Sequence, residues 1–283
     1  MLSSKRLKEV KIYKPLPKFP PISVTGCACA LNCAHCSRHY LAHMINPARF
    51  GGLEALIEYL VSHQRINGVL ISGGLNKDLK VPIKWEEVRR IKEKYDIKIN
   101  VHVGIITEED VEKIASSDVD VVSLDFVFSD DVIRNVYGIQ NKTRMDYLRM
   151  LDLLEDHGVR YAPHLTVGIN WGRVSWEYEA INTLKDRKFD VLVLNVLIPT
   201  KGTPMENVKL DDTAVKKVFT YARNVLTNKE LSLGCMRPRG NQYEKLAVEL
   251  GFERIVLPHK EIIKTIKDLG MCIIKRETCC VFR

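Results

Sequence analysis

The sequence has no hydrophobic run long enough to cross a membrane, and its start, MLSSKRLKEVKIYKPLPKFPP, lacks the apolar core of a secretory signal. Aromatic residues are sparse, at 7% of 283 residues, and no tract gathers the basic residues behind the net charge of +8. Lys and Arg are instead spread along amphipathic segments such as 88–95, which argues against a nucleic-acid binder. We therefore expect a cytoplasmic protein that works without a membrane.

The chain does contain a large apolar fraction and eight cysteines. Hydrophobic residues make up 46% of the chain and charged residues 28%, which is typical of a globular protein with a substantial core. Because cytoplasmic thiols are kept reduced, eight cysteines there indicate metal or redox chemistry rather than disulfides.

Three of the cysteines lie within eight residues, Cys29, Cys33 and Cys36, with the spacing C-x3-C-x2-C. Thiolates this close in sequence cannot easily pair as disulfides, but a single loop can use them to hold three irons of a 4Fe-4S cube. The fourth iron then has no protein ligand, so it can bind a small chelating molecule. The alternative is a zinc site, because structural zinc usually takes four ligands and His35 or His39 could complete the set.

Apolar, β-branched runs alternate with segments of helical periodicity along the chain. The predicted strands are 22–25, 69–72, 97–103, 119–126, 161–167, 191–198, 231–233 and 254–257, and the predicted helices are 52–63, 85–95, 108–116, 130–136, 144–157, 176–187, 212–228, 243–250 and 260–269. This order implies an α/β fold with a parallel sheet, and at this length the economical closure is a (β/α)8 TIM-type barrel. An open doubly wound sheet is the alternative. We expect 1–21 to be an N-terminal extension, 22–270 the barrel and 271–283 a C-terminal tail that closes over the barrel mouth.

Polar residues at alternate strand positions favour the barrel. They are Asn100 and His102, Ser123 and Asp125, His164 and Thr166, and Asn195. Central strands of an open sheet are buried on both faces and read as continuous apolar runs, whereas inward-facing polar residues near the carboxyl ends of barrel strands can line a cavity. A carboxylate such as Asp125 is costly to bury unless it meets a charge or a hydroxyl, so it is a candidate ligand contact. His102 and His164 fit a hydrogen-bonded core or a ligand contact equally well.

Two turns follow predicted strands on the same side of the fold. Leu70-Ile-Ser-Gly-Gly74 ends the second strand, and Gly73 and Gly74 would allow the backbone to approach a ligand closely. Pro199-Thr-Lys-Gly-Thr-Pro204 follows the sixth strand and reads as a ligand-facing turn or as a simple tight turn. Thr107 and Asp110 have the form of a capping box, which supports a helix start at 108.

Four more cysteines lie in the last fifty residues: Cys235, Cys272 and the adjacent pair Cys279 and Cys280. If the apolar tail folds back across the barrel, Cys279 and Cys280 would join Cys235 as three ligands of an auxiliary cluster. The alternative is that the adjacent pair merely packs in the tail or forms a redox pair. Cys272 alternates with apolar residues in a short predicted strand, so we interpret it as a core residue.

Two arginines and one cysteine lie near these motifs. Arg237 and Arg239, which follow Cys235, could neutralise a cluster or a carboxylate, ligate iron or form a surface salt bridge. Cys27 belongs to neither group of three thiols, and we interpret it as a bystander at the end of the first predicted strand.

Together, the three-cysteine loop, the barrel pattern, the Gly-Cys-Met-Arg-Pro-Arg-Gly segment at 234–240 and the Cys-Cys tail resemble the archaeal biotin-synthase-like group of radical S-adenosylmethionine (SAM) proteins. That group includes the subunits of the two-component lipoyl synthase. The resemblance implies a 4Fe-4S cluster that binds SAM and a second 4Fe-4S cluster. Their expected ligands are Cys29, Cys33 and Cys36 for the first, and Cys235, Cys279 and Cys280 for the second. The residues expected beside SAM are His35, Gly73, Gly74, Asp125 and His164. Leu75 replaces the acid of the family's Gly-Gly-Glu motif, so only the backbone role carries over.

The resemblance implies a radical SAM sulfurtransferase. A 5′-deoxyadenosyl radical would remove hydrogen from a protein-bound octanoyl chain, and the auxiliary cluster would be sacrificed as the sulfur source. No side chain is expected to be catalytic, because the cofactors break the bonds. The implied partners are an octanoylated lipoyl-domain protein, a paralogous radical SAM subunit and an electron donor such as ferredoxin. Alternatives are methylthiolation or rearrangement by another radical SAM enzyme, a non-catalytic iron-sulfur protein, and an RNA-modifying enzyme.

Overall fold

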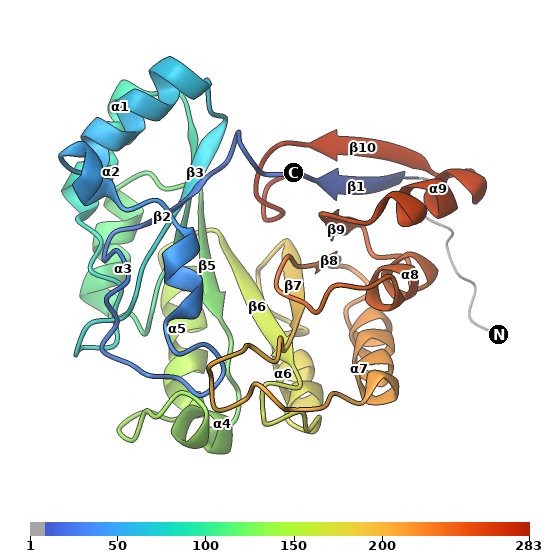
Figure 1. Ribbon diagram of the computed structural model, residues 1–283. Coiled ribbons are helices and arrows are strands. Elements are labelled where there is room, and N and C mark those ends of the chain that lie inside the picture. Colours follow the sequence, from blue (N-terminus) through green and yellow to red (C-terminus); the bar gives the residue numbers. More distant parts are fainter. Residues whose placement is uncertain (1–8) are drawn as a thin grey trace.

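The computed structural model describes residues 9–283 and is built around one ten-stranded parallel sheet. Its strands are β1 (Glu9–Tyr13), β2 (Pro21–Ser23), β3 (Gly68–Ser72), β4 (Lys98–His102), β5 (Val121–Asp125), β6 (Tyr161–Val167), β7 (Val191–Val196), β8 (Glu230–Leu233), β9 (Arg254–Val256) and β10 (Cys272–Arg276). They pair in the order β10-β1-β9-β8-β7-β6-β5-β4-β3-β2. The sheet curls, but its edge strands β2 and β10 do not pair with each other, so it is a partial barrel (Figure 1).

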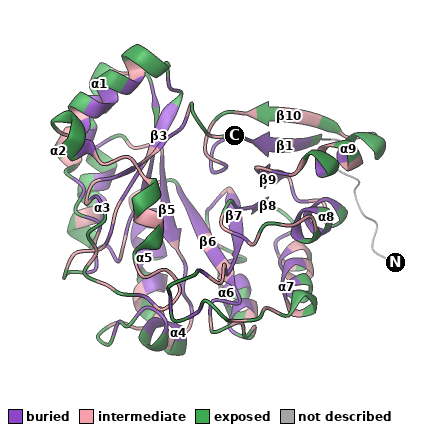
Figure 2. Ribbon diagram, in the orientation of Figure 1, coloured by how far each residue is buried: buried purple, intermediate pink, exposed green. Residues whose placement is uncertain are grey.

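Helices cover the outer face of the curled sheet and turn their buried sides toward it (Figure 2). They are α1 (Leu53–Gln64), α2 (Trp85–Lys94), α3 (Glu108–Ser116), α4 (Asp130–Asn135), α5 (Arg144–Asp156), α6 (Glu177–Leu184), α7 (Asp212–Val225), α8 (Gln242–Glu249) and α9 (Lys260–Asp268), with the short 3-10 helices η1 (His39–His43) and η2 (Pro47–Phe50). Among residues 9–283, no helix is both long and apolar enough to span a membrane.

The predicted TIM-type α/β class is confirmed, and the eight predicted strands and nine predicted helices are all found within the described residues. Two further strands extend the sheet: β10 is the short strand predicted around Cys272, and β1 inserts between β9 and β10. Residues 9–13 were expected to belong to an extended arm; instead Val10 and Ile12 are buried in the sheet. The rest of the predicted arm that precedes them, residues 1–8, lies outside the described residues.

Strand alternation divides the buried side chains into two cores. On β5, Val122 and Leu124 point outward and belong to the large core under the helices. Val121 points inward and belongs to a smaller core inside the barrel, together with Ala162 and Val191. Each fully buried aliphatic side chain stabilises the fold by about 1.5–3 kcal/mol. The inner core closes one end of the barrel, so any cavity must open at the other end, the mouth.

Helix caps fix where the chain leaves the mouth. Before α3, the Thr107 amide donates to Asp110 Oδ2 at 2.7 Å, which confirms the predicted capping box. Before α5, the Thr143 amide donates to Asp146 Oδ2 at 2.8 Å in the same way. Each box satisfies amides that the first helical turn leaves free.

The C-terminal tail enters the barrel at the end opposite the mouth. Residues 280–282 pack against Val121, Ala162 and Val191, which lie at or next to the first residues of β5, β6 and β7. Figure 1 shows the C-terminal end beside β1 and β10, far from α4, which follows the carboxyl end of β5. The prediction that the tail closes over the mouth is therefore wrong. The inner core at this end is apolar, so burying the apolar tail there removes more apolar surface from water.

Polar contacts hold the main chain of the tail in place. The Tyr13 hydroxyl donates to the carbonyl oxygen of Phe282 at 2.7 Å. Burial raises the pKa of Tyr13 to about 12, so this hydroxyl stays protonated and can donate. Arg254, whose side chain is fully buried, donates to the carbonyl oxygens of Cys280 and Phe282 at 2.5 and 3.0 Å and pairs with Glu230.

Replacing Arg254 with methionine should destabilise the protein and loosen the tail. Arg254→Met removes two hydrogen bonds to the tail and leaves Glu230 with one cationic partner, so the free energy of unfolding should fall by about 3 kcal/mol. Denaturation in urea measures this loss, and the rate of iodoacetamide modification of Cys279 and Cys280 should rise.

Lys11→Met is the matched control, because Lys11 pairs with the same carboxylate at 2.7 Å but does not bond to the tail. It should cost about 1 kcal/mol or less and leave the alkylation rate unchanged. Equal effects of the two variants would contradict the tail-holding role of Arg254.

Candidate functional site

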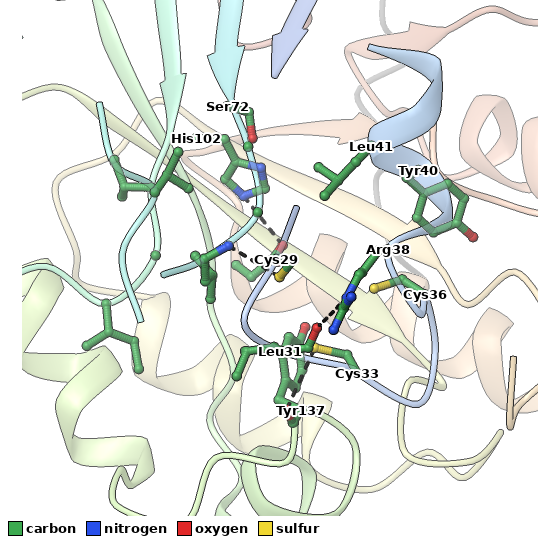
Figure 3. Close-up of a pocket in the computed structure, with 18 of the residues that line it drawn as sticks. Cys29, Leu31, Cys33, Cys36, Arg38, Tyr40, Leu41, Ser72, His102 and Tyr137 are labelled. Atoms are coloured by element: carbon green, nitrogen blue, oxygen red, sulfur yellow. Dashed lines mark hydrogen bonds and ion pairs between the residues drawn. The ribbon is translucent and has the colours of Figure 1, made fainter. Parts of the chain in front are cut away.

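The loop between β2 and η1 carries Cys29, Cys33 and Cys36, and all three line one cavity at the mouth (Figure 3). The loop is tightly turned, because the amides of Cys36 and Ser37 both donate to the carbonyl oxygen of Cys33, at 3.2 and 3.0 Å. Cys33 Sγ lies 3.7 Å from the carbonyl oxygen of Tyr137. The predicted group of three thiols therefore faces a single cavity.

Gly74, just after β3, allows this loop to lie against the sheet. A Cβ atom on Gly74 would lie 2.1 Å from the carbonyl oxygen of Ala28 and 2.5 Å from Cβ of Cys29. Beside it, the Leu75 amide donates to Cys29 Sγ at 3.3 Å, and the Leu75 carbonyl accepts from the Ala30 amide at 2.7 Å. The absence of a side chain at Gly74 therefore allows the cysteine loop to pack closely against the end of β3. Contact between Gly74 and SAM stays a prediction.

The thiols of this loop favour a metal-binding charge state. A hydrogen bond from Cys33 lowers the pKa of the Cys36 thiol, and His35 acts in the same direction. The same interaction with Cys36, together with burial, raises the pKa of Cys33. The thiolate is the form that binds metal, so one ligand is available without further proton loss.

The donor set suits a cluster better than a single ion. Ligand atoms of Cys33, His35 and Cys36 all lie within 4.8 Å of one another, as the zinc alternative would need. Cys29 lies outside that group but lines the same cavity, so the loop offers three thiolates, the ligands that a 4Fe-4S cube takes. His35 Nδ1 is buried without a hydrogen-bond partner, so a polar group at this position would satisfy it. The residues present therefore fit a 4Fe-4S cluster.

A polar group of three side chains lies on β4, β5 and β6, as the alternation of polar residues predicted: His102 and Asp125 end their strands, and His164 lies in the middle of β6. Their ligand atoms lie within 4.8 Å of one another, with His102 Nε2 and Asp125 Oδ1 3.8 Å apart. The rings of His102 and His164 are 5.4 Å apart. Burial, reinforced by His102, lowers the pKa of His164 to about 3, so this ring stays neutral. His102 and Asp125 line the mouth cavity, and the predicted contacts of Asp125 and His164 with SAM stay predictions.

The mouth cavity has a volume of about 180 Å³ and a largely apolar wall. Besides the residues already named, it is lined by Leu31, Arg38, Tyr40, Leu41, Ser72, Gly73, Val81, Val103, Gly104, Ile105, Ile139 and Tyr147. The Tyr40 hydroxyl is hydrogen-bonded to Thr200 Oγ1 at 2.6 Å, which ties η1 to the turn at 199–204. Tyr137 and Tyr147 were missed from the sequence, because a single aromatic residue after α4 or inside α5 follows no repeating pattern.

A second polar layer lies deeper in the barrel. Asn100 Nδ2 donates to Cys279 Sγ at 3.5 Å, and Asn100 Oδ1 accepts from Ser123 Oγ at 2.9 Å. Asn100 and His102 are two residues apart on β4 and point into the same barrel, so the two layers are about 7 Å apart. The tail thus brings a thiol to a point just below the mouth cavity.

The other two predicted auxiliary ligands lie near Cys279. The Cys280 thiol donates to Cys279 and lowers its pKa to about 7, while the same interaction raises the pKa of Cys280. Cys235 follows the end of β8 and is exposed as a residue, yet desolvation of its thiol and the nearby charge of Cys279 raise the pKa of that thiol. Among the described residues these thiols form no group within 4.8 Å, so they do not suit a single ion.

Two buried polar atoms in this region have no hydrogen-bond partner, Asn195 Oδ1 and Thr278 Oγ1. Asn195 Oδ1 would lie only 2.0 Å from a Cβ atom on Gly234, the residue before Cys235, and Thr278 directly precedes Cys279. Unsatisfied buried atoms are rare in folded proteins. Two near the same thiols fit a polar group that binds between them.

The structure changes the interpretation of two residues in this part of the chain. Arg237 is buried and donates to Glu244 Oε1 at 2.7 Å and to the carbonyl oxygens of Gly234 and Val256 at 2.5 and 2.9 Å. The alternative in which it neutralises a carboxylate is therefore the one that the structure bears out, and the surface salt bridge is wrong because both side chains are buried. Its Nε is buried without a hydrogen-bond partner. Cys272 is exposed on the edge strand β10, so the prediction that it is a core residue is wrong. Cys27 is exposed and lines neither site.

Comparison with known proteins adds a family match. The family model of the radical SAM superfamily matches residues 23–172, more than half of the chain. A curated relative, the biotin synthase of Sulfurihydrogenibium sp. (strain YO3AOP1), is 24% identical over 194 residues, which is 65% of this chain and 56% of that protein. The chain therefore spans little more than half the length of that relative.

Solved structures share the fold. The FeFe-hydrogenase maturase HydG from Carboxydothermus hydrogenoformans superposes with a TM-score of 0.67 at 18% identity, covering 98% of this chain and 70% of that one. Methylornithine synthase (PylB) superposes with a TM-score of 0.63 at 11% identity, covering 95% of this chain and 85% of that one. At such low identities the likeness describes the architecture alone.

Substituting Gly74 should remove the capacity of the loop to bind a cluster. Gly74→Ala forces Cys29 away from β3, so iron and sulfide bound after anaerobic reconstitution should fall by half or more with the fold retained, as checked by circular dichroism. Gly73→Ala is the control with a milder clash, because its Cβ atom would lie 3.1 Å from Thr25 Oγ1. It should lower the iron content less than Gly74→Ala does. Equal iron content in both variants would contradict the close-packing role of Gly74.

His164 should make stability depend on pH. Its folded pKa of about 3 lies below the value near 6.5 of an unfolded histidine, so as the pH falls below about 6.5 only the unfolded chain gains this proton. The free energy of unfolding should therefore fall by about 2 kcal/mol between pH 7 and pH 5 because of this group. Urea unfolding curves of the wild type and His164→Gln should diverge over that range, whereas His43→Gln, at an exposed position, should follow the wild type. Parallel curves for His164→Gln would rule the effect out.

Proposed function

Because this chain belongs to the radical SAM superfamily, we propose that it is a sulfur-inserting radical SAM enzyme, and that it acts as one subunit of a two-component lipoyl synthase. Membership implies a 4Fe-4S cluster and SAM. One observation carries the finer proposal: two groups of three thiols lie at successive levels of one barrel, the second presented by the tail and by the end of β8.

In this proposal each group of thiols has its own cofactor. Cys29, Cys33 and Cys36 hold the first cluster at the mouth and leave one iron to SAM. Cys235, Cys279 and Cys280 hold the second cluster. When bound, these cofactors supply a 5′-deoxyadenosyl radical at the mouth and sulfide below it. A sequence relative named biotin synthase, whose reaction is also a sulfur insertion, supports this division of labour.

The side chains between the two levels set the path of the substrate. Asn100 and His102 are about 7 Å apart along β4, so a carbon chain placed beside them could meet the radical above and the sulfide below without moving far. Proximity of this kind lowers the barrier by removing a diffusive step. The neutral ring of His164 and the carboxylate of Asp125 bound this space on β6 and β5, where we propose that they contact SAM.

The wall of the mouth cavity suits an aliphatic substrate. Leu41, Val81 and Ile105 are among its lining residues, and apolar walls with few polar groups are typical of sites that bind carbon chains. Such a wall also excludes water from a reactive carbon centre. We therefore propose a protein-bound octanoyl chain as the substrate, with each abstracted hydrogen ending on 5′-deoxyadenosine.

The proposed reaction requires partners and a reducing compartment. Each SAM consumed takes one electron, for which a low-potential donor such as ferredoxin is suited. The net charge of +8 would favour an acidic lipoyl domain as the carrier of the octanoyl chain, and a paralogous subunit would complete the enzyme. All eight cysteines are free thiols, which fits the cytoplasm, where such thiols are kept reduced.

The test is to count irons with and without the second group of thiols. Anaerobically reconstituted wild type should hold about eight irons in two cubes, and the Cys235→Ala/Cys279→Ala/Cys280→Ala variant about four. Iron and labile sulfide analysis with Mössbauer spectroscopy measures both. The variant should still cleave SAM reductively but lose sulfur insertion into an octanoylated lipoyl-domain peptide.

Cys272→Ala is the control, because this thiol is exposed on β10 and lies outside both groups. It should keep all eight irons within error, about two cubes. If wild type and triple variant both hold a single cube, sulfur insertion and the lipoyl assignment are abandoned and the radical SAM assignment remains.

A further inference from the structure

We propose that Asn100 is a positioning residue of the second thiol site: its side-chain amide donates to Cys279 Sγ and aims that sulfur at the cluster. This inference rests on the proposed function, because it assumes that Cys279 is a cluster ligand. It goes beyond the cysteines themselves, since it assigns part of the second site to the barrel wall and not to the tail.

The orientation of the amide follows from its two neighbours. Asn100 and Ser123 are each 1% exposed and lie on the adjacent strands β4 and β5, where Ser123 is opposite His102 and contacts Asn100 diagonally. Ser123 Oγ donates to Asn100 Oδ1 at 2.9 Å, which leaves Nδ2 directed at Cys279 Sγ, 3.5 Å away. With this orientation both ends of the amide have partners. The opposite orientation would place an acceptor, Oδ1, against an iron-bound thiolate, which has no proton to donate.

The apolar surroundings show that the amide at this position must be hydrogen-bonded. Neighbouring inward-facing residues, Val121, Ala162 and Val193, are apolar and belong to the inner core. A buried amide among them is unfavourable by a few kcal/mol unless it is hydrogen-bonded. An aliphatic residue at 100 would pack as well, so the useful property of asparagine is its donor. Only Cys279 receives that donor among the hydrogen bonds of the described residues.

Asn100 also complements the way the tail is held. Arg254 bonds to the main-chain carbonyl of Cys280, which places the backbone but not the side chain of the preceding residue. Without iron, the Cys280 thiol also donates to Cys279, but that proton is lost when Cys280 binds a metal, so Asn100 supplies a side-chain donor that remains. Asn100 provides that contact from β4, a strand far from the tail in sequence.

A hydrogen bond to a ligand sulfur has a measurable electronic consequence. The reduced cluster carries one more negative charge than the oxidised cluster, so a donor stabilises it more and raises the reduction potential. Loss of the donor should therefore shift the potential of the second cluster to more negative values. A residue with a merely structural role would change stability without moving the potential.

The experiment uses the full chain with Cys29→Ala/Cys33→Ala/Cys36→Ala, so that only the second site can hold a cluster. In this background, Asn100→Leu and Ser123→Ala are compared by redox titration followed by electron paramagnetic resonance. Asn100→Leu should shift the midpoint potential negatively and change the g-values. Ser123→Ala should give a smaller shift in the same direction, because the amide remains but is free to turn. The double variant should match Asn100→Leu alone, since Ser123 acts through Asn100.

Each outcome bears on a different statement. A background protein without iron would overturn both the auxiliary cluster and this inference. A cluster whose potential and g-values stay unchanged in both Asn100→Leu and Ser123→Ala would overturn the inference and leave the proposed function intact. Additive shifts in the double variant would show that Ser123 does not act through Asn100, which also overturns it. If Asn100→Leu fails to fold, as circular dichroism would reveal, Ser123→Ala alone decides by the same criterion.

Discussion

The alternation of side chains along a β-strand is the constraint on which both thiol sites depend. On β4, Ile99 and Val101 are fully buried under the helices, so Asn100 and His102 must point into the barrel. A slip of one residue would exchange these two sets and place the polar pair in the apolar outer core. The same alternation on β5 places Ser123 beside Asn100. The two levels of the lumen are therefore consecutive inward positions of the same strands.

The barrel is closed at one end by its own tail and open at the other to the cysteine loop. Residues 280–282 fill the inner core, and the ring centroids of Phe282 and Phe19 are 5.5 Å apart. At the mouth, the loop carrying Cys29 rests on Gly74 with no room for a side chain. Thiols therefore lie at both ends of the lumen, those of the tail at the closed end and those of the cysteine loop at the mouth. An arrangement with one closed end favours a reaction that must be kept from water.

Two buried arginines connect the second site to the scaffold. Arg237 donates to the carbonyl of Gly234, the residue before Cys235, and Arg254 donates to the carbonyl of Cys280. Each is balanced by a carboxylate, Glu244 or Glu230, because a buried charge without a partner would be strongly destabilising. The two segments that carry these thiols, far apart in sequence, are therefore held by the same type of main-chain contact.

Local patterns in the sequence determined much of this protein. The three-cysteine spacing, eight strands, nine helices and the inward polar residues all follow from periodicity or from residue chemistry over short distances, which a linear sequence records directly. Only the tertiary structure decided that β1 and β10 extend the sheet into a partial barrel, that the tail enters opposite the mouth, that Arg237 bonds to Glu244 and that Cys272 is exposed. These features depend on pairings between residues up to 269 positions apart, as between Tyr13 and Phe282. Such pairings are chosen by the packing of the whole chain, so no local pattern encodes them.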